Sequence, residues 1–412
     1  MRTQTENAAR VVVIGAGMAG ARLAARVPGV TVIGEESHAP YNRVLLAEVL
    51  AGRYEPDVIA LPAADVRRGV RAVRIDRAER RVLCDDGGVI GYEHLVLATG
   101  SNPVLPPLRG LGHTLPDGVH PFRTLDDCLA LRAAVRPGVR AVVIGGGLLG
   151  VSAARALAEC GAQVVLAQQG EHLMERQLDA EASGMLRRHL EALGVEVHTE
   201  CRVRGLRCTD GDTPAVRAVE LADGYELEAE ITVLACGVRP RAGLAQAAGL
   251  EVRKGIVVDD ELRTSDPYIH AVGDCAEHAG TVYGLAGAAL EQADVLAEVL
   301  AGRPARYGGT RALTRLTLRS PAAAPVAAGA SGGLDLAAFG DSRPMPGDDV
   351  IRLADATRGA YRTVVVRGDR LAGGVLFGDL AAVGTLARTW QDDDALPADM
   401  SLLHLLTNDG GS

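Results

Sequence analysis

Short runs of β-branched and aliphatic residues recur along the chain, and two of them end at a glycine-rich turn that leads into an alanine-rich stretch. The two runs cover 11–14 and 141–144, and the alanine-rich stretches cover 21–27 and 151–160. A short continuous apolar run is typical of a buried strand, whereas a longer alanine- and leucine-rich stretch favours a helix. The pattern therefore predicts two strand–turn–helix units that lie far apart in the sequence.

Each unit continues with the same order of elements. In both units the helix is followed by a second strand and then by a β-rich stretch with a glycine turn. Each unit closes with an apolar strand that ends in glycine. In the first unit these cover 30–33, 70–90 with a turn at 86–88, and 95–100; in the second they cover 164–167, 216–228 with a turn at 223–224, and 231–237. The shared order indicates that the fold, although not the detailed sequence, is duplicated.

The rest of the chain predicts a return to the first unit and a small terminal domain. A strand over 269–274 and a helix over 284–300 cannot extend the second unit, which is already complete, so we assign them to the first. Residues 320–333, rich in alanine, proline and glycine, predict a loop. Residues 361–366 and 371–377, joined by Gly368-Asp369, predict a hairpin, and 381–390 a helix.

These elements predict an α/β protein with two Rossmann-like, three-layer domains and a small C-terminal α+β domain. Pro103, Pro106 and Pro107 interrupt regular structure and mark the exit from the first domain. We expect a discontinuous first domain over 1–118 and 238–304, a second domain over 119–237, and a third over 305–412.

The two glycine turns carry the chemistry. They read Gly15-Ala16-Gly17-Met18-Ala19-Gly20 and Gly145-Gly146-Gly147-Leu148-Leu149-Gly150. In such a turn the first glycine makes the bend, the second lets the backbone approach a pyrophosphate, and the third lets helix and strand pack closely. Two dinucleotides on one chain indicate electron transfer between them, most simply from a nicotinamide to a flavin.

An acid follows the second strand of the first unit. Glu35, with Glu36 beside it, stands 20 residues beyond Gly15, where an acid binds the adenosine ribose hydroxyls in this motif. The alternative interpretation is a solvated surface acid. Its place at a strand end favours ribose binding.

The composition of the chain restricts the kinds of partner that it can bind. The net charge of −9 argues against nucleic acid, and no apolar run is long enough to span a bilayer. The polar first ten residues lack the apolar core of a signal peptide, so we expect a cytoplasmic protein without membrane association. Lys254 is the sole lysine, which argues against a catalytic lysine.

Seven scattered cysteines form no Cys-x-x-Cys pair. An odd set without ligand spacing is typical of reduced structural thiols. We therefore expect neither a metal nor an iron–sulfur cluster.

Residues 10 to about 305 resemble the two-dinucleotide-binding flavoprotein reductases, such as ferredoxin reductases and NADH oxidases. The order of glycine turn, Ala98-Thr99-Gly100, second glycine turn and Gly273-Asp274 carries this resemblance. Three further runs, 40–48, 173–179 and 273–278, resemble the FAD/NAD(P)H region of the large subunit of assimilatory nitrite reductase, and stand-alone electron-transfer subunits of assimilatory nitrate reductases.

The resemblance implies roles for individual residues. Asp274 would bind the ribityl chain of FAD, and Arg43 its pyrophosphate or adenine. The residues expected at FAD are Gly15, Gly17, Met18, Ala19, Gly20, Glu35, Glu36, Arg43, Ala98, Thr99, Gly100, Gly273 and Asp274. Those expected at NAD(P)H are Gly145, Gly147, Leu148, Leu149, Gly150, Gln168 and Gly237.

Departures from the family pattern refine the expectation. No cysteine lies between Gly20 and Gly52, which excludes the dithiol chemistry of the disulfide reductases and argues against single-cysteine types. Glu48 stands where Rieske-type ferredoxin reductases usually have lysine, and Ser152 where many relatives have glutamate. Gln168 replaces the acid that would hold the 2′-hydroxyl of NAD, but no adjacent arginine would bind a 2′-phosphate, so NADH is favoured over NADPH.

The sequence thus predicts an NAD(P)H-dependent FAD oxidoreductase that passes electrons to a separate acceptor protein, a nitrate or nitrite reductase component. Hydride transfer needs orientation rather than an acid–base pair, so no catalytic side chain is assigned. A reductase for a ferredoxin or rubredoxin of another pathway remains open, as does a non-catalytic flavin redox sensor. The oligomeric state is left open.

Overall fold

The structure, a computed structural model, describes residues 9–62, 66–112, 114–311, 313–319, 333–397 and 402–406. The chain forms two compact units, which are treated separately below. Unit 1 comprises Met1–Val104, Arg123–Cys128 and Val238–Thr310. Unit 2 comprises Leu105–Phe122, Leu129–Gly237 and Arg311–Ser412, and so includes the C-terminal residues. The predicted three-domain division stays a prediction.

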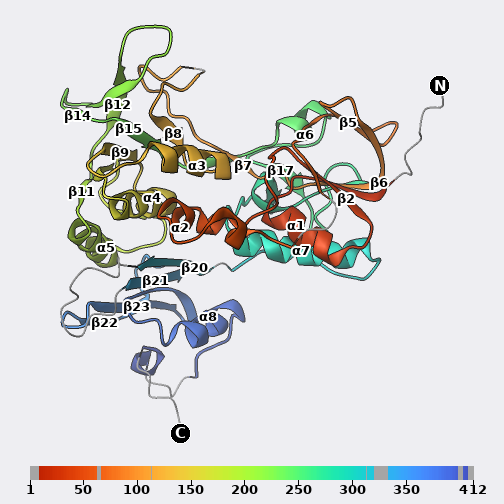
Figure 1. Cartoon of the computed structure of the whole chain (residues 1–412). Coiled ribbons are helices and arrows are strands. Elements are labelled where there is room, and N and C mark those ends of the chain that lie inside the picture. Colours follow the sequence, from red (N-terminus) through yellow and green to blue (C-terminus); the bar gives the residue numbers. More distant parts are fainter. Residues whose placement is uncertain are drawn as a thin grey trace. The chain divides into compact units, whose positions relative to one another are not determined.

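Unit 1 is built on a parallel sheet extended by an antiparallel meander (Figure 1). The parallel strands lie in the order β3 (Val66–Arg68), β2 (Val30–Gly34), β1 (Ala9–Ile14), β6 (Val89–Leu97) and β18 (Ile269–Ala271). The antiparallel strands β4 (Ala72–Asp76) and β5 (Arg81–Cys84) continue from β6. Two short pairs join β7 (Ser101–Pro103) to β16 (Val238–Pro240) and β17 (Ile256–Val258) to β19 (Ala276–His278).

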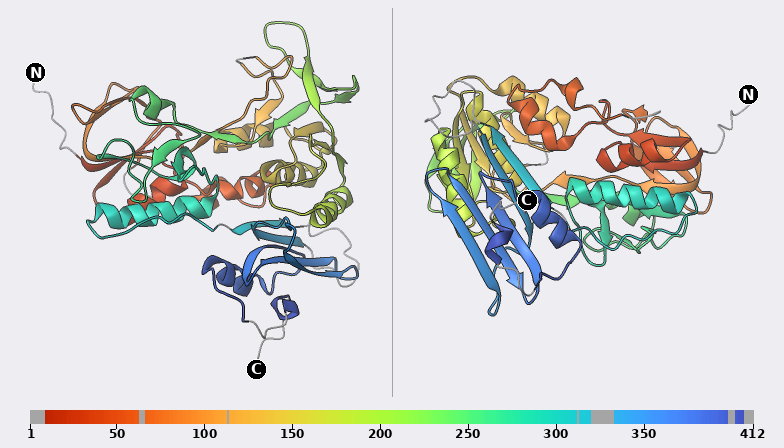
Figure 2. Two further views of the ribbon diagram at one scale, coloured as in Figure 1. Left: turned by 180° about the vertical axis from the view of Figure 1, so that it is seen from behind. Right: turned by 90° about the horizontal axis from the view of Figure 1, so that it is seen from below.

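The helices of unit 1 are mostly short. They are α1 (Met18–Arg26), α2 (Leu46–Leu50), α6 (Gly243–Ala247) and α7 (Ala286–Leu300), with the 3₁₀ turns η1 (Arg43–Leu45), η2 (Pro56–Ile59) and η3 (Gly273–Cys275). The helices α1 and α7 pack side by side (Figure 2). The prediction that 269–274 and 284–300 belong with the first unit is therefore confirmed, since β18 pairs with β6 and α7 packs on α1.

The strand β6 belongs to two sheets at once. Its first half pairs antiparallel with β5 and its second half pairs parallel with β1. The sequence pattern separated a β-rich stretch ending at Ile90 from a strand beginning at Leu95, whereas the chain runs straight through. Leu95, Val96 and Leu97 are fully buried, because this half of the strand has neighbours on both edges.

Unit 2 repeats the parallel arrangement. Its sheet has the order β11 (Val195–His198), β10 (Gln163–Ala167), β9 (Arg140–Ile144), β15 (Ile231–Leu234) and β8 (Val119–Pro121). A second, antiparallel sheet holds β12 (Val203–Cys208), β13 (Val216–Leu221) and β14 (Glu226–Glu228). Its helices are α4 (Leu148–Glu159) and α5 (Ala180–Ala192), whereas α3 (Leu125–Ala134) begins among residues of unit 1 and ends in unit 2.

The C-terminal part of unit 2 is the predicted α+β structure. An antiparallel sheet has the order β20 (Leu313–Arg319), β21 (Gly333–Gly340), β24 (Arg370–Phe377), β23 (Ala360–Arg367) and β22 (Asp349–Asp355). The helix α8 (Val383–Gln391) covers β21 and β24 through Leu386 and Trp390, and η4 (Leu402–Leu405) follows. The loop predicted over 320–333 lies outside the described residues, apart from Gly333 at the start of β21.

The predicted hairpin turns are confirmed. Asp86-Gly87-Gly88 connects β5 to β6, Asp223-Gly224 connects β13 to β14, and Gly368-Asp369 connects β23 to β24. None of the described helices is long and apolar enough to cross a membrane.

The two helices after the glycine turns begin earlier than predicted. The alanine-rich pattern placed their starts at Ala21 and Val151, whereas α1 begins at Met18 and α4 at Leu148. The third glycine of each turn is therefore inside the first helical turn, and the second glycine is the N-cap. The first backbone N–H groups of each helix, which have no partner within the helix, therefore lie directly at the glycine turn.

Candidate functional site

The first glycine turn follows β1 in unit 1 and has a distinct requirement at each glycine. Gly15 has φ +113°, and a Cβ there would overlap the carbonyl oxygen of Ala98. A Cβ on Gly20 would overlap the carbonyl oxygen of Gly15, which shows that α1 packs against the turn. These two glycines fulfil the roles predicted for the first and third positions.

The middle glycine differs from the other two. Gly17 has φ −76° and ψ −167°, a conformation open to any residue, and a Cβ there would meet nothing closer than Nε of Arg43 at 3.8 Å. Neither the backbone nor protein packing therefore requires glycine at this position. The free space lies at the N-terminus of α1, whose cap forms no side-chain hydrogen bond, so Met18 and Ala19 present N–H groups there. A pyrophosphate fits such a site.

The second glycine turn, in unit 2, repeats this geometry residue by residue. Gly145 has φ +110°, and a Cβ there would overlap the carbonyl oxygen of Ala235, whereas a Cβ on Gly150 would overlap the carbonyl oxygen of Gly145. Gly147 has φ −79°, no atom lies within 4 Å of an added Cβ, and no side chain caps the helix. Leu148 and Leu149 form the first turn of α4. Unit 2 thus has its own place for a pyrophosphate.

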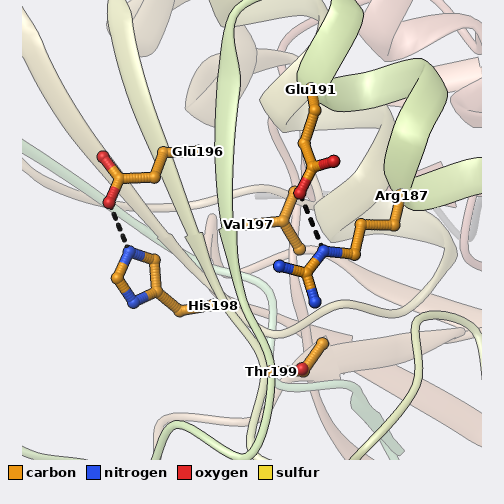
Figure 3. A pocket seen from close by; sticks show the side chains of 6 residues that line it. All are labelled: Arg187, Glu191, Glu196, Val197, His198 and Thr199. Atoms are coloured by element: carbon orange, nitrogen blue, oxygen red, sulfur yellow. Dashed lines mark hydrogen bonds and ion pairs between the residues drawn. The ribbon is translucent and has the colours of Figure 1, made fainter. Parts of the chain in front are cut away.

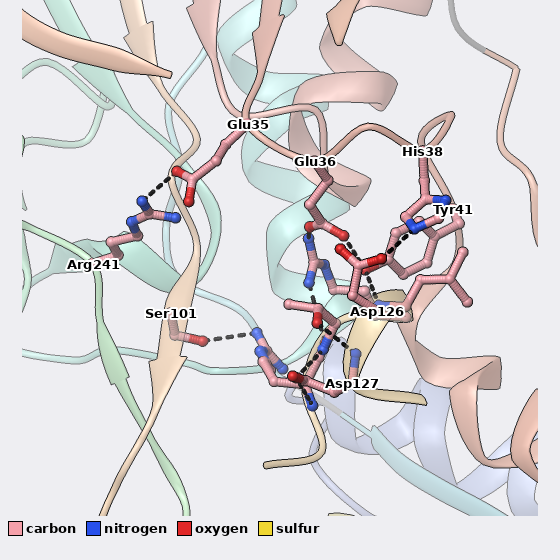
Figure 4. A network of polar contacts seen from close by, with 12 residues as sticks. Glu35, Glu36, His38, Tyr41, Ser101, Asp126, Asp127 and Arg241 are labelled. Carbon is pink, nitrogen blue, oxygen red and sulfur yellow. Dashed lines mark hydrogen bonds and ion pairs between the residues drawn. The ribbon is translucent and has the colours of Figure 1, made fainter. Parts of the chain in front are cut away.

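The two acids after β2 are engaged by arginines (Figure 4). Glu35, which is largely exposed, forms an ion pair with Arg241. Glu36 forms an ion pair with Arg43 and accepts a hydrogen bond of 2.6 Å from the hydroxyl of Tyr41. Glu35 lies at the strand end as predicted, and its role at a ribose stays a prediction.

Arg43 lies beside the first glycine turn, as its predicted role requires. Its Nη1 donates to the carbonyl oxygen of Arg123 over 3.2 Å, and its guanidinium lies 5.1 Å from the ring centre of Tyr41. The Tyr41 hydroxyl accepts a 2.9 Å hydrogen bond from the N–H of Leu125 at the start of α3. Burial, more than the neighbouring Glu36, raises the pKa of Tyr41, so this hydroxyl stays protonated and can donate to Glu36.

The segment Ala98-Thr99-Gly100 adjoins the first glycine turn. The carbonyl of Ala98 faces Gly15, the hydroxyl of Thr99 donates to the carbonyl of Arg241 over 2.7 Å, and Gly100 has φ +71°. The turn that closes β6 is thus joined to the chain that re-enters unit 1 at Val238.

Gly273 and Asp274 form the start of η3 in unit 1. Gly273 has φ +79°, and its N–H donates to the buried side chain of Gln292 over 2.7 Å. The carboxylate of Asp274 accepts hydrogen bonds from Nη2 of Arg123 at 2.5 Å and from Oγ of Ser101 at 2.9 Å. Asp274 thus lies in a polar cluster with Arg123. Burial lowers the pKa of Arg43, but Tyr41 and Glu36, and to a smaller extent Asp274, raise it by more.

Sequence reasoning missed several members of this cluster. They are Tyr41, Ser101, Arg123, Arg241 and Gln292. One local signal was present for Arg123. It directly precedes Thr124, the residue before α3, whose hydroxyl accepts a hydrogen bond from the N–H of Asp127 in the first turn of the helix. The carboxylate of Asp127 in turn accepts hydrogen bonds from the N–H groups of Thr124 and of Arg123 itself. A helix start of this kind fixes the position of the residue before it.

Gln168 lies at the end of β10, but its carboxamide faces the glycine turn. Its Oε1 accepts a 2.8 Å hydrogen bond from the N–H of Gly146, and its Nε2 donates to the carbonyl of His172 over 3.2 Å. Ser152, where many relatives have glutamate, is nearly buried and donates to the carbonyl of Leu148 one turn earlier in α4. Gly237, with φ +95°, follows β15 and is the last residue of the Leu129–Gly237 segment of unit 2.

A surface cavity of about 470 Å³ lies elsewhere in unit 2 (Figure 3). It is lined by Arg187, Glu191, Glu196, Val197, His198 and Thr199. Its charged residues pair with one another: Arg187 with Glu191 at 2.8 Å and His198 with Glu196 at 2.6 Å. None of the predicted site residues lines this cavity.

None of the seven cysteines forms a disulfide bond. Burial raises the pKa of Cys236 to about 11, and it also raises the pKa of Cys84, Cys160, Cys201, Cys208 and Cys275. These thiols are therefore poor nucleophiles at neutral pH. Among the described residues, no three metal-ligating side chains lie together in a way that could hold an ion.

The predicted FAD residues thus all lie in unit 1, the predicted NAD(P)H residues all lie in unit 2, and each unit has a glycine turn shaped for a pyrophosphate. The sequence matches the pyridine nucleotide-disulphide oxidoreductase family over residues 9–293. The chain belongs to this family.

The similar proteins include electron-transfer enzymes of nitrogen metabolism. The chain is 35% identical to the assimilatory nitrate reductase electron transfer subunit of Bacillus subtilis (strain 168), over 90% of this chain and 48% of that protein. It is 33% identical to the nitrite reductase [NAD(P)H] of the same organism, over 98% of this chain and 50% of that protein. The chain therefore spans about half the length of these curated relatives.

Solved structures include a match along nearly the whole chain. The covalent putidaredoxin reductase–putidaredoxin complex contains a chain that superposes with a TM-score of 0.81 and 26% identity, covering 94% of both chains. The two-dinucleotide fold predicted from the sequence is confirmed by this match.

Proposed function

We propose that this chain binds NAD(P)H in unit 2 and FAD in unit 1, so that a hydride from NAD(P)H would reduce the flavin. The electrons would then pass to a separate protein that is a component of assimilatory nitrate or nitrite reduction. The paired glycine turns carry the proposal, because each has an unobstructed middle glycine at a helix N-terminus. The nitrate reductase electron transfer subunit named above supports the choice of acceptor. A cytoplasmic location, expected from the sequence, is part of the proposal.

In unit 1, the chain's own residues would hold the flavin nucleotide. The N–H groups of Met18 and Ala19 would bind pyrophosphate oxygens, with Arg43 adding a positive charge beside Gly17. Glu35 or Glu36 would accept hydrogen bonds from the adenosine ribose. Asp274 would bind the ribityl chain, and Arg123 would orient its carboxylate.

In unit 2, the N–H groups of Leu148 and Leu149 would bind the pyrophosphate of the nicotinamide nucleotide. Gln168 would keep the turn in shape through its hydrogen bond to Gly146. Bound FAD supplies the hydride acceptor and releases electrons singly, so the protein has to bind and orient the two nucleotides rather than move a proton. No catalytic side chain is therefore assigned.

A ferredoxin-type acceptor is the second candidate. The solved putidaredoxin reductase matches along 94% of its own chain, whereas the nitrogen-metabolism relatives are about twice as long as this one. The acceptor lies outside the chain, so residues within it do not separate the two candidates. The redox-sensor alternative stays open until turnover is measured.

An anaerobic titration of the purified protein with NADH, and separately with NADPH, tests the proposal. Stoichiometric bleaching of the flavin absorbance by either coenzyme is the expected result. A bound flavin that neither coenzyme reduces would contradict the proposal and favour the sensor. Mixing the reduced protein with a nitrate or nitrite reductase component, or with a ferredoxin, then identifies the acceptor by which of them reoxidises the flavin.

A further inference from the structure

The residue at the end of β10 is not free to select the coenzyme. Both ends of the Gln168 carboxamide are used within the protein, one by Gly146 and the other by His172. To contact a ribose, Gln168 would have to give up hydrogen bonds that shape the glycine turn. Selection between NADH and NADPH must therefore depend on another group near the carboxyl end of β10.

A carboxylate from a different position lies at this strand end. The side chain of Glu175 folds back over Gly170, three residues after β10, so closely that a Cβ on Gly170 would overlap it. One of its oxygens accepts a 3.2 Å hydrogen bond from the backbone N–H of His172. This donor is a neutral backbone group rather than a cationic side chain.

The loop that carries Glu175 is anchored to the dinucleotide turn. The N–H of Met174, a residue with φ +50°, donates to the carbonyl of Gly146 over 2.9 Å. The side chain of Leu173 is fully buried, and its N–H donates to Oγ of Ser183 in α5 over 2.8 Å. Glu175 thus has a fixed place relative to the pyrophosphate site at Gly147.

Within the part of the chain that the structure describes, no arginine forms an ion pair with the carboxylate of Glu175. Arg343, from the C-terminal part of unit 2, donates to the backbone carbonyl of Glu175, and Arg176 is exposed. Glu171, also exposed, lies 3.9 Å from Nε2 of His172.

We propose that Glu175 is the residue that selects NADH over NADPH, replacing the acid that Gln168 lacks. The inference rests on the proposed NAD(P)H site in unit 2. A carboxylate beside the adenosine ribose accepts hydrogen bonds from the 2′- and 3′-hydroxyls of NADH and repels the 2′-phosphate of NADPH. The loop 173–179, rather than the end of β10, sets the position of the Glu175 carboxylate. A search for an acid directly after the strand therefore does not find Glu175.

Glu175→Gln tests the inference, because glutamine keeps the acceptor for the N–H of His172 and removes only the charge. The matched control is Glu171→Gln, an exposed acid two residues before this loop. Steady-state kcat/KM is measured with both coenzymes. Binding of ADP-ribose and of its 2′-phosphate derivative is measured by calorimetry, which needs no hydride transfer.

We expect the wild-type protein to prefer NADH, and Glu175→Gln to lower the NADH/NADPH ratio by about tenfold, or about 1.4 kcal/mol. The Glu175→Gln variant should bind the 2′-phosphate derivative of ADP-ribose more tightly than the wild type does. Glu171→Gln should change neither the NADH/NADPH ratio of kcat/KM nor the relative affinities of the two ADP-ribose ligands. An unchanged ratio in Glu175→Gln, an equal shift in Glu171→Gln, or a wild type that prefers NADPH would overturn the inference. Failure of the wild type to react with either coenzyme would instead overturn the proposed function, and the ligand-binding measurements would still test Glu175.

Discussion

Nη2 of Arg123 lies 2.5 Å from Oδ2 of Asp274, although the two residues are 151 positions apart in the sequence. Both side chains are mostly buried, with about one sixth of their surface exposed. Ser101 shares the same carboxylate oxygen. The pair therefore connects the segment just before α3 to η3, where the resemblance places the flavin ribityl chain, and it holds the carboxylate in one orientation.

Asp274→Asn should weaken FAD binding. The substitution removes the charge that is proposed to bind the ribityl hydroxyls, and it leaves Arg123 without its anion. The expected cost is about 1.5–3 kcal/mol, or roughly 10- to 150-fold in affinity. Fluorescence titration of apoprotein with FAD measures the effect. Asp294→Asn, which breaks the 2.7 Å pair with Arg22 between α7 and α1, is the control and should bind FAD normally. An equal loss in both variants would contradict the assigned role of Asp274.

Gly17→Val should yield folded protein without FAD. The backbone at Gly17 suits valine and there is room for a Cβ, so the loss arises from blocking the pyrophosphate. The ratio of absorbance at 450 nm to that at 280 nm reports the flavin content (about 450 nm being the usual flavin band). Normal FAD content in this variant would refute the assignment of the first turn.

Gly147→Val is the counterpart in unit 2. Its backbone also suits valine and nothing lies near an added Cβ, so we expect normal FAD content with loss of flavin reduction by either coenzyme. Stopped-flow absorbance after mixing with NADH measures this. The normal FAD content is itself the folding control for Gly147→Val, and a Gly147→Val protein that lacked FAD would show that the two turns are not independent.

Tyr361→Phe should loosen the C-terminal sheet. The buried hydroxyl of Tyr361 donates to Asp179 over 2.6 Å, and Asp179 also caps α5 through the N–H of Ala182. Loss of this charge-assisted hydrogen bond should cost about 1–2 kcal/mol of unfolding free energy. Trp390, the sole tryptophan, lies in this part of unit 2 and reports its unfolding by fluorescence. Tyr225→Phe, at an exposed tyrosine, should not change the midpoint.

Mild acid should destabilise unit 1 through His270. Burial, together with His94 and Arg263, lowers the pKa of His270 to about 4 from its ordinary 6.5. Because the folded-state pKa lies below the unfolded one, the unfolded chain binds the proton first. Stability is therefore complete above about pH 6.5 and falls by up to about 3 kcal/mol as the pH approaches 4.

Urea unfolding followed by FAD release, at pH 7.5, 6 and 5 (values spanning roughly that window), measures the effect of His270. His270→Asn should flatten the pH dependence in this window even if it lowers stability overall. A variant with the same pH dependence as the wild type would assign the acid sensitivity to other groups.

The parts of the molecule that depend on neighbours in sequence could be predicted. The glycine turns, their flanking strands and the hairpins each follow from a few consecutive residues, because φ angles and alternating burial are local properties. Even so, Gly20 and Gly150 lie inside helices that the alanine pattern started three residues later. Glycine weakens a helix, so propensity alone places the start after it, whereas packing against the turn places it before.

The contacts that complete the site could not be predicted in this way. Arg123, Arg241 and Tyr361 reach partners 151, 206 and 182 residues away. Such pairings depend on how strands and loops return to one another, which no local pattern records. Gln168 was placed correctly, but its side chain faces the glycine turn because Gly146 offers a backbone donor there.

The loop Leu173–Asp179 has a consequence for protein engineering. Its backbone contacts the second glycine turn through the N–H of Met174. Glu175, Gln177 and Asp179 accept hydrogen bonds from Arg343, Ser342 and Tyr361 of the C-terminal part. A chimera that takes its C-terminal segment from a relative would join surfaces that did not evolve together. Exchanging the loop Leu173–Asp179 together with the C-terminal segment keeps the hydrogen bonds between them, so the two should be replaced together.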